Sequence, residues 1–207
     1  DGVTKDYKEA LTWYRLAAEQ GDADAQVNIG LMYDRGEGVA EDNHAAMQWY
    51  LLAANQGHSE AQLNIGTLFD EGEGVRESKQ QAIEWYKLAA AQGLVVAKFN
   101  LGLLYQLESL SPDSTDKAIR WYRAAADQGD AYAQVNLGRI YDFGDGVPED
   151  NGKAITWYEK AANQGHPEGQ YLLGTMYDYG DGVSENKDKA VAWYNTAADN
   201  GSNRALN

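Results

Sequence analysis

Cysteine is absent from the chain, and basic residues are scarce: 17 lysines and arginines stand against 32 acidic residues, which gives a formal net charge of −15 over 207 residues. Without cysteine, disulfide bonds and thiolate chemistry are excluded. The negative charge argues against nucleic acids and anionic membrane surfaces as partners, because both attract positively charged protein surfaces. A basic or neutral partner suits this composition better.

Long hydrophobic runs and an initiator methionine are also absent. No apolar run approaches the ~20 residues that a membrane-spanning helix needs, so we expect no membrane insertion. The chain begins at Asp1 without a signal peptide, and we expect it to be a processed or excised piece of a longer array.

What the sequence does contain is a period of 36 residues. The pair Trp-Tyr recurs six times, a glycine follows each tryptophan after eight positions, and a second glycine column precedes an aromatic residue by three positions. Because no insertion breaks the register, the chain is an array of one repeated unit. The three columns are Trp13, Trp49, Trp85, Trp121, Trp157 and Trp193; Gly21, Gly57, Gly93, Gly129, Gly165 and Gly201; and Gly30, Gly66, Gly102, Gly138 and Gly174.

Each unit contains two helical patterns. One has apolar residues at Ala46, Tyr50 and Ala53, and the other has them at Ala61, Ile65 and Phe69, which in both cases is the spacing of a helix with one apolar face. No alternating strand pattern of useful length occurs. The sequence therefore predicts an all-α fold.

The ends of these helices carry recognisable signals. We expect the Gly21 column to end the Trp-Tyr helix, because glycine turns left-handed without strain. Pro167 sits where the other helix begins, which suits a first-turn position. A residue able to cap the free amides precedes each Trp-Tyr helix, at Asp6, Asp42, Ser78, Ser114, Asp150 and Asn186.

The glycines inside the helices need a structural reason, because each one costs about 1 kcal/mol relative to alanine. We expect them to allow close approach between helices, facing small residues such as Ala17 and Ala18, with Trp and Tyr rings filling the remaining space. A single helix pair buries too little apolar surface to be stable alone. Stacking into a curved solenoid is therefore predicted.

The segment "AQLNIGTLFDEGEGV…AIEWYKLAAAQG" resembles the Sel1-like repeat, a relative of the tetratricopeptide repeat, and the match covers essentially the whole chain. The resemblance implies a right-handed α-solenoid in which the glycine-containing helix comes first in each unit and the Trp-Tyr helix second. Residues 1–21 would then be the second helix of a preceding unit, and 202–207, with Ala205 in the Ala25 column, the start of another. Complete units are predicted at 22–57, 58–93, 94–129, 130–165 and 166–201.

One unit departs from the pattern. Four units carry a Gly-x-Gly-Val loop between their helices, whereas unit 94–129 has "ESLSPDS", with Glu108 and Leu110 in place of the two glycines. The unit keeps its length, so we expect its helices to keep their register. We interpret the change as sequence drift, with a partner contact as the alternative.

In the related solenoids the first helices line a concave face that holds a peptide or a partner surface. By that resemblance, the inward columns here are those of residues 24, 27, 28, 31, 34 and 35. The asparagines at column 28 either hold a peptide backbone or bond within the array, and the sequence leaves both open. We expect Val27 and Leu63 to pack inside the array, and apolar residues beyond what packing requires to contact a partner. The predicted partner-binding residues are Asn64, Phe99, Asn100, Leu103, Leu107, Asn136, Arg139, Phe143, Tyr171 and Tyr179.

Acidic residues recur at the end of the first helix. They either form a rim that steers a basic partner or a solvated face that keeps the array soluble. Two carboxylates per loop fall short of the six or more oxygens that calcium needs, so we predict no metal and no cofactor. The rim residues are Asp34, Asp70, Asp142 and Asp178.

Catalysis is not predicted. His44, His58 and His166 form no pair with metal-ligand spacing and are expected to be surface residues. A Ser-x-x-Lys pattern begins at Ser114 and at Ser184, but no Lys-Thr-Gly follows, and a capping role explains Ser114 better. No unit breaks the repeat with a convergent acid, base and nucleophile.

The sequence thus predicts a non-catalytic, monomeric scaffold that binds a protein or peptide, basic or apolar in character, in its concave groove. One alternative is a protein that binds, or weakly turns over, a small molecule or a cell-wall fragment of β-lactam type. Another is a purely structural spacer. The resemblance favours a periplasmic or secreted location over a cytoplasmic one.

Overall fold

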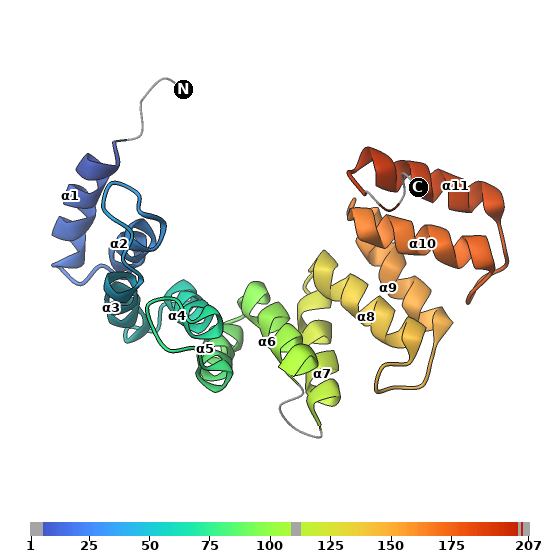
Figure 1. The fold of residues 1–207 in the computed structure, drawn as a ribbon, viewed down its shortest axis with the longest axis horizontal. Helices are drawn as coiled ribbons and strands as arrows, with labels where there is room; N and C mark the ends of the chain where they lie inside the picture. Colours follow the sequence, from blue (N-terminus) through green and yellow to red (C-terminus); the bar gives the residue numbers. More distant parts are fainter. Residues whose placement is uncertain (1–5, 109–112, 203, 205–207) are drawn as a thin grey trace. The chain divides into compact units, whose positions relative to one another are not determined.

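The computed structural model of the protein describes residues 6–108, 113–202 and 204. This part of the chain contains eleven α-helices and no β-strand (Figure 1). The all-helical architecture predicted from the sequence is therefore confirmed. The helices are α1 (Tyr7–Ala18), α2 (Ala23–Arg35), α3 (Asn43–Ala54), α4 (Ser59–Glu71), α5 (Lys79–Ala91), α6 (Val95–Glu108), α7 (Ser114–Ala126), α8 (Ala131–Phe143), α9 (Asn151–Asn163), α10 (Pro167–Tyr179) and α11 (Lys187–Asp199).

The chain divides into two compact units, residues 1–97 and 98–207, with the division inside α6. In the first unit, α2 packs against α3 and α4 packs against α5, while α1 contacts α2 and α3 contacts α4. In the second unit, α8 pairs with α9 and α10 with α11, while α7 contacts α8 and α9 contacts α10. Each unit is thus a stack in which a first helix and a second helix alternate.

The signals at the helix ends act as predicted in all but one case. The side chains of Asp6, Asp42, Ser78, Asp150 and Asn186 accept hydrogen bonds from backbone amides in the first turns of α1, α3, α5, α9 and α11. The glycines of the Gly21 column have φ between 83° and 96°, and Pro167 is the first residue of α10.

The exception is Ser114, which the sequence placed in the capping column. The N-cap of α7 is Asp113, and Ser114 is the first residue of the helix. The Asp113 side chain forms an ion pair with Lys117 at 2.9 Å and makes no capping hydrogen bond. The cap prediction was therefore wrong for this repeat. The four residues before this position, 109–112, lie outside the described part of the chain, as do the atypical Leu110 and the C-terminal Ala205.

The partner of the mid-helix glycines also differs from the prediction. They face the tyrosine of the Trp-Tyr pair rather than small residues: a Cβ added at Gly138 would lie 2.3 Å from Cε1 of Tyr158, and one at Gly30 would lie 2.4 Å from Cε1 of Tyr50. The phenol ring takes the space that the missing side chain leaves. As a result, Tyr50, Tyr86, Tyr122 and Tyr158 are at most 1% exposed.

Neighbouring repeats are also joined by buried glutamines. Gln134 of α8 is 3% exposed; it donates to the carbonyl of Ala126 at the end of α7, at 3.1 Å, and accepts from Gln164 after α9, at 2.8 Å. Gln26 makes the same two contacts, with Ala18 and Gln56. One side chain therefore connects three helices.

Candidate partner-binding surface

Near its C-terminus, the first helix of each repeat carries a polar side chain that accepts a hydrogen bond from the tyrosine of the second helix. The tyrosine hydroxyl donates to a side chain sixteen positions earlier in the chain. Each of the four aspartates predicted to form the acidic rim is such an acceptor. The pairs are Tyr50 with Asp34 at 3.4 Å, Tyr86 with Asp70 at 3.5 Å, Tyr122 with Gln106 at 2.8 Å, Tyr158 with Asp142 at 3.1 Å, and Tyr194 with Asp178 at 3.3 Å.

The four aspartates differ from fully solvated carboxylates in their pKa values or in their ion pairs. Burial raises the pKa of Asp34 and that of Asp142. Asp70 pairs with Lys79 at 2.9 Å, and Asp178 pairs with Lys187 at 3.0 Å. The structure therefore corrects the rim prediction, because these four carboxylates are engaged in contacts within their own repeat.

The asparagine column also contacts the tyrosines. The side chain of Asn64 on α4 lowers the pKa of Tyr50, and that of Asn136 on α8 lowers the pKa of Tyr122, although burial raises both pKa values overall. Each of these asparagines connects its first helix to the second helix of the preceding repeat. Of the two roles that the sequence left open, these contacts favour bonding within the array.

A row of exposed apolar side chains runs over the first helices of the second unit. Leu107 of α6, Phe143 of α8 and Tyr179 of α10 occupy the same position in three consecutive repeats. Their exposures are 67%, 74% and 72%, so none of them contributes much to the core. We call these three residues the apolar row. All three were among the predicted partner-binding residues.

The same position in the first unit is charged. Arg35 ends α2 and Glu71 ends α4, and both are exposed. Since a charged residue serves equally well at this point of the repeat, the fold does not require the apolar side chains of the second unit.

Exposed acidic residues follow the row closely in the chain. Asp145 and Glu149 come after Phe143, and Asp181 and Glu185 come after Tyr179; all four are exposed. Acidic residues thus follow the row in the sequence, while the ammonium group of Lys187 lies 6.0 Å from the centroid of the Tyr179 ring.

A second group of aromatic residues lies at the other end of these first helices. The ring centroids of Phe99 and Tyr132 are 6.2 Å apart, and Tyr132 meets the ring of His166 edge-on at 4.6 Å. Tyr132 is 65% exposed and was missed by the sequence reasoning. The sequence could have indicated this exposure, because the equivalent positions of the first unit hold the acidic residues Asp24 and Glu60.

Two of the three histidines have a structural role that the sequence did not indicate. His58 and His166 are the N-caps of α4 and α10, and their Nδ1 atoms accept from the amides of Ala61 at 3.4 Å and Gly169 at 3.3 Å. His58 also contacts Asp24 through Nε2 at 2.8 Å. Burial lowers the pKa of His166. Both histidines, which were expected to be surface residues, are thus half-buried caps of first helices.

The remaining predicted residues are less available to a partner. Arg139 forms an ion pair with Glu168 of the next first helix. Tyr171 packs against Tyr194, with the ring centroids 5.5 Å apart. Asn100 and Leu103 are half-buried on α6, as is Phe99.

The serines that matched a β-lactam-reactive pattern are not arranged for that chemistry. Ser114 is 5% exposed, and Lys117 is paired with Asp113. Lys187 pairs with Asp178 and Glu185 instead of activating Ser184. Within residues 6–108, 113–202 and 204, no three His, Asp or Glu side chains gather as a metal site would require.

Comparison with known proteins gives the family. A family model of the Sel1 repeat matches residues 1–22, 23–58, 59–94, 95–130, 131–166 and 167–202. The chain belongs to the Sel1 repeat family. No match was found among curated proteins. In the described part of this Sel1 array, no helix has both the length and the apolar character needed to cross a membrane.

Two solved structures show the same fold. A protective antigen of uropathogenic Escherichia coli, described as having an SLR fold, is 36% identical over 99% of this chain, with a TM-score of 0.92. A Sel1 repeat protein from Oxalobacter formigenes is 35% identical over 97% of this chain and 80% of its own, with a TM-score of 0.85. The array spans only 44% of the length of the E. coli protein. The predicted helical solenoid is confirmed by these similarities.

Proposed function

We propose that this Sel1 array is a non-catalytic protein-interaction scaffold that binds an extended peptide segment on the first-helix face of its second unit. Sel1 repeats generally mediate contacts between proteins. The observation that carries the proposal is the apolar row, in which Leu107, Phe143 and Tyr179 are each at least 67% exposed. Exposed apolar side chains in register are typical of contact sites.

The spacing of the row indicates what kind of segment fits it. We take successive first helices to lie about 9 Å apart, the usual distance between neighbouring helices, and an extended chain advances about 3.3 Å per residue. Successive row residues are therefore about three peptide residues apart, so an apolar residue at every third position would meet each of them in turn.

Charge complementarity adds a second requirement. Asp145, Glu149, Asp181 and Glu185 are exposed and follow row residues by two or six positions in the chain, and the whole chain carries a net charge of −15. Lysine or arginine between the apolar positions would be attracted to these carboxylates, and the attraction would weaken with salt. The proposed partner is a basic segment with regularly spaced apolar residues.

The test uses a labelled peptide of about 12 residues with leucine at every third position and lysine between, enough to span the three repeats. Phe143→Ser combined with Tyr179→Ser should weaken its binding at least about tenfold, measured by fluorescence anisotropy, because two rings lose their contact. The matched control is Leu52→Ser with Leu88→Ser, which removes two side chains that are 49% exposed on second helices of the first unit.

Equal losses in the two double variants would contradict the proposal, as would undiminished binding in the Phe143 and Tyr179 variant. A structural spacer would bind neither this peptide nor its acidic counterpart. No contact described above favours the small-molecule or β-lactam alternative, since Ser114 is buried. Nitrocefin turnover lost in Ser114→Ala would nevertheless revive it.

A further inference from the structure

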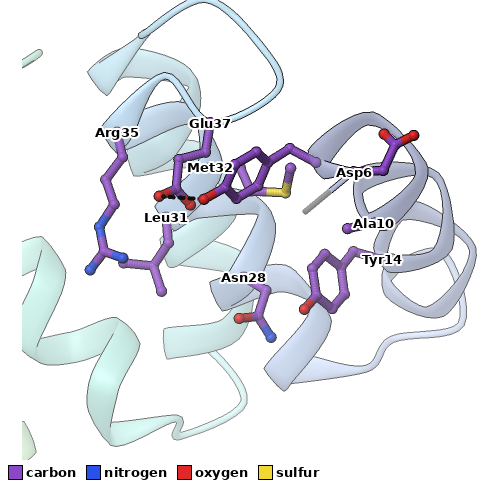
Figure 2. Close-up of a pocket in the computed structure, with 9 residues that line it drawn as sticks. Asp6, Ala10, Tyr14, Asn28, Leu31, Met32, Arg35 and Glu37 are labelled. Carbon is purple, nitrogen blue, oxygen red and sulfur yellow. Dashed lines mark hydrogen bonds between the residues drawn. The ribbon is translucent and has the colours of Figure 1, made fainter. Parts of the chain in front are cut away.

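The first unit has a pocket of about 320 Å³ between α2 and the beginning of α4, at the lower end of the about 300–1,000 Å³ typical of ligand pockets. Its lining combines two carboxylates and a histidine with apolar side chains. Asn28 and Leu31 of α2 also line a neighbouring pocket, which Figure 2 shows. The residues around the pocket are Asp24, Val27, Asn28, Leu31, His58 and Glu60.

The second unit contains a counterpart of this site. Four of the six lining residues recur unchanged three repeats later, as Val135, Asn136, His166 and Glu168. The other two positions differ, because Arg139 stands in place of Leu31 and Tyr132 in place of Asp24. The comparison therefore isolates two changes at an otherwise common site.

In the second unit, side chains of the chain itself occupy the site. Glu168 pairs with Arg139 and, at 3.6 Å, with Arg204. The side chains of Arg139 and Glu168 are 35% and 36% exposed, so this ion pair is partly withdrawn from solvent. Tyr132 lies edge-on against the ring of His166. The acidic residue at this position of the repeat thus binds guanidinium groups.

Glu60 has the same position in the repeat but lacks those partners. Leu31 stands where Arg139 stands and Val96 where Arg204 stands, and neither side chain can donate to a carboxylate. In the part of the chain that the structure describes, no lysine or arginine pairs with Glu60. The first unit therefore has the acceptor of this contact, with an open pocket beside it, and lacks the donor.

Asp24 adds a second carboxylate to the pocket of the first unit. The Nδ1 atom of His58 accepts from the amide of Ala61, so the neutral ring carries its proton on Nε2. That proton is donated to Oδ1 of Asp24, at 2.8 Å. The Asp24 side chain is 86% exposed, which leaves its carboxylate accessible to a ligand. The pocket thus offers two carboxylates to one cation.

We propose that this pocket binds the side chain of an arginine from a partner polypeptide. The guanidinium group pairs with Glu60 and Asp24, and its methylene stem lies against Leu31. Because guanidinium presents five donors in a planar fork, it can bind two carboxylates at once, whereas lysine offers a compact point charge. The site lies in the first unit and does not depend on the apolar row.

The histidines make binding observable by NMR. His58 lines the pocket, His166 lies at the occupied site of the second unit, and His44 on α3 lines neither site. In a titration with N-acetyl-arginine amide near pH 7, the imidazole signals of His58 should shift saturably. We expect half-saturation at about 1 mM, which is usual for a ligand of this size. The signals of His44 and His166 should stay in place, and N-acetyl-lysine amide should bind at least about threefold more weakly.

Variants of the two equivalent sites supply the controls. Glu60→Gln should weaken binding at least about tenfold, because an amide carries no charge for the guanidinium. Glu168→Gln removes the equivalent carboxylate of the second unit and should leave the titration of His58 unchanged. Leu31→Arg places an arginine where Arg139 stands and should abolish binding of the free probe, whereas Leu31→Gln, of similar length but uncharged, should retain it. Circular dichroism melts check that each variant is folded.

Three results would overturn the proposal: equal binding of the arginine and lysine probes, equal losses in Glu60→Gln and Glu168→Gln, or equal shifts of all three histidines. Each would reduce the effect to a general attraction between cations and an acidic protein. The double variant of Phe143 and Tyr179 should bind the arginine probe as the parent chain does, and a loss there would contradict the assignment to the first unit. The arginine pocket and the apolar row are therefore tested separately.

Discussion

Replacing Gly138 by alanine tests the central packing contact of the repeat. In an ordinary helix interior this change is stabilising by about 1 kcal/mol, because glycine has the greater backbone freedom to lose on folding. Here the added methyl carbon would lie 2.3 Å from Cε1 and 2.5 Å from Cδ1 of Tyr158, a side chain with no exposed surface. The expected sign is therefore the opposite.

The size of the loss follows from what the ring must do. An ordinary carbon–carbon contact is about 3.5 Å, so the Tyr158 ring would have to retreat by about 1 Å into a packed core, and overpacking of this kind costs about 1–3 kcal/mol. The same movement disturbs the 3.1 Å hydrogen bond from Tyr158 to Asp142, which is worth about 1 kcal/mol. After the gain in helix propensity is deducted, we expect a net loss of about 2 kcal/mol.

Urea denaturation followed by circular dichroism measures this loss, and the melting temperature should fall by about 4–8 °C. Gly152→Ala in α9 is the matched control, because its Cβ would meet only Oδ1 of Asp150, at 3.4 Å, and position 152 is exposed. The control should be neutral or slightly stabilising. If Gly138→Ala stabilised the protein as well, the glycine would not be needed for contact with Tyr158.

Two further predictions concern the polar contacts between helices. Burial raises the pKa of Asp142, so the folded chain holds this proton more tightly than the unfolded chain, and stability falls as the pH rises from about 4 through the raised pKa. Asp142→Asn keeps an acceptor for Tyr158 and removes the titrating group. Urea titrations should therefore show equal or greater stability at pH 7 and a smaller loss of stability across that pH window. An unchanged pH dependence would contradict the raised pKa of Asp142. Gln134→Leu leaves the Ala126 carbonyl and the Gln164 amide without their partner, so it should lower the free energy of unfolding by about 2 kcal/mol. A loss below measurement error would show that this hydrogen-bonded link is dispensable.

Much of the fold could be predicted because its signals are local. The capping side chains, the left-handed glycines and Pro167 act within one helical turn, so their identity is enough to place helix ends. The 36-residue period adds the pairing of helices, since identical units must pack in an identical way. Ser114 shows the limit of this reasoning: its column indicated a cap, but the N-cap is Asp113, one residue earlier, and its side chain pairs with Lys117.

The contacts between helices were harder to predict, because a period reveals which residues recur but not which of them touch. Gly30 was expected to face alanine and instead faces Tyr50. Asp34 was expected on a rim and instead accepts from the same tyrosine. Tyr132 was missed for a different reason. Its column has no shared residue type, so the repeat pattern did not mark it, and its exposure emerged only from the structure.

The repeat separates positions that the fold constrains from positions that it leaves free. Glycine and tyrosine recur unchanged because each fills the space that the other leaves, so a change at either one disturbs two helices at once. The position at the end of the first helix has no such partner, and it holds Arg35 and Glu71 in one unit but Leu107, Phe143 and Tyr179 in the other. The repeat accepts charge at this position, so the apolar residues of the second unit are explained by a contact outside the repeat better than by folding. If the array binds its partner at the apolar row, as proposed, recognition depends on where its repeats differ, whereas stability depends on where they agree.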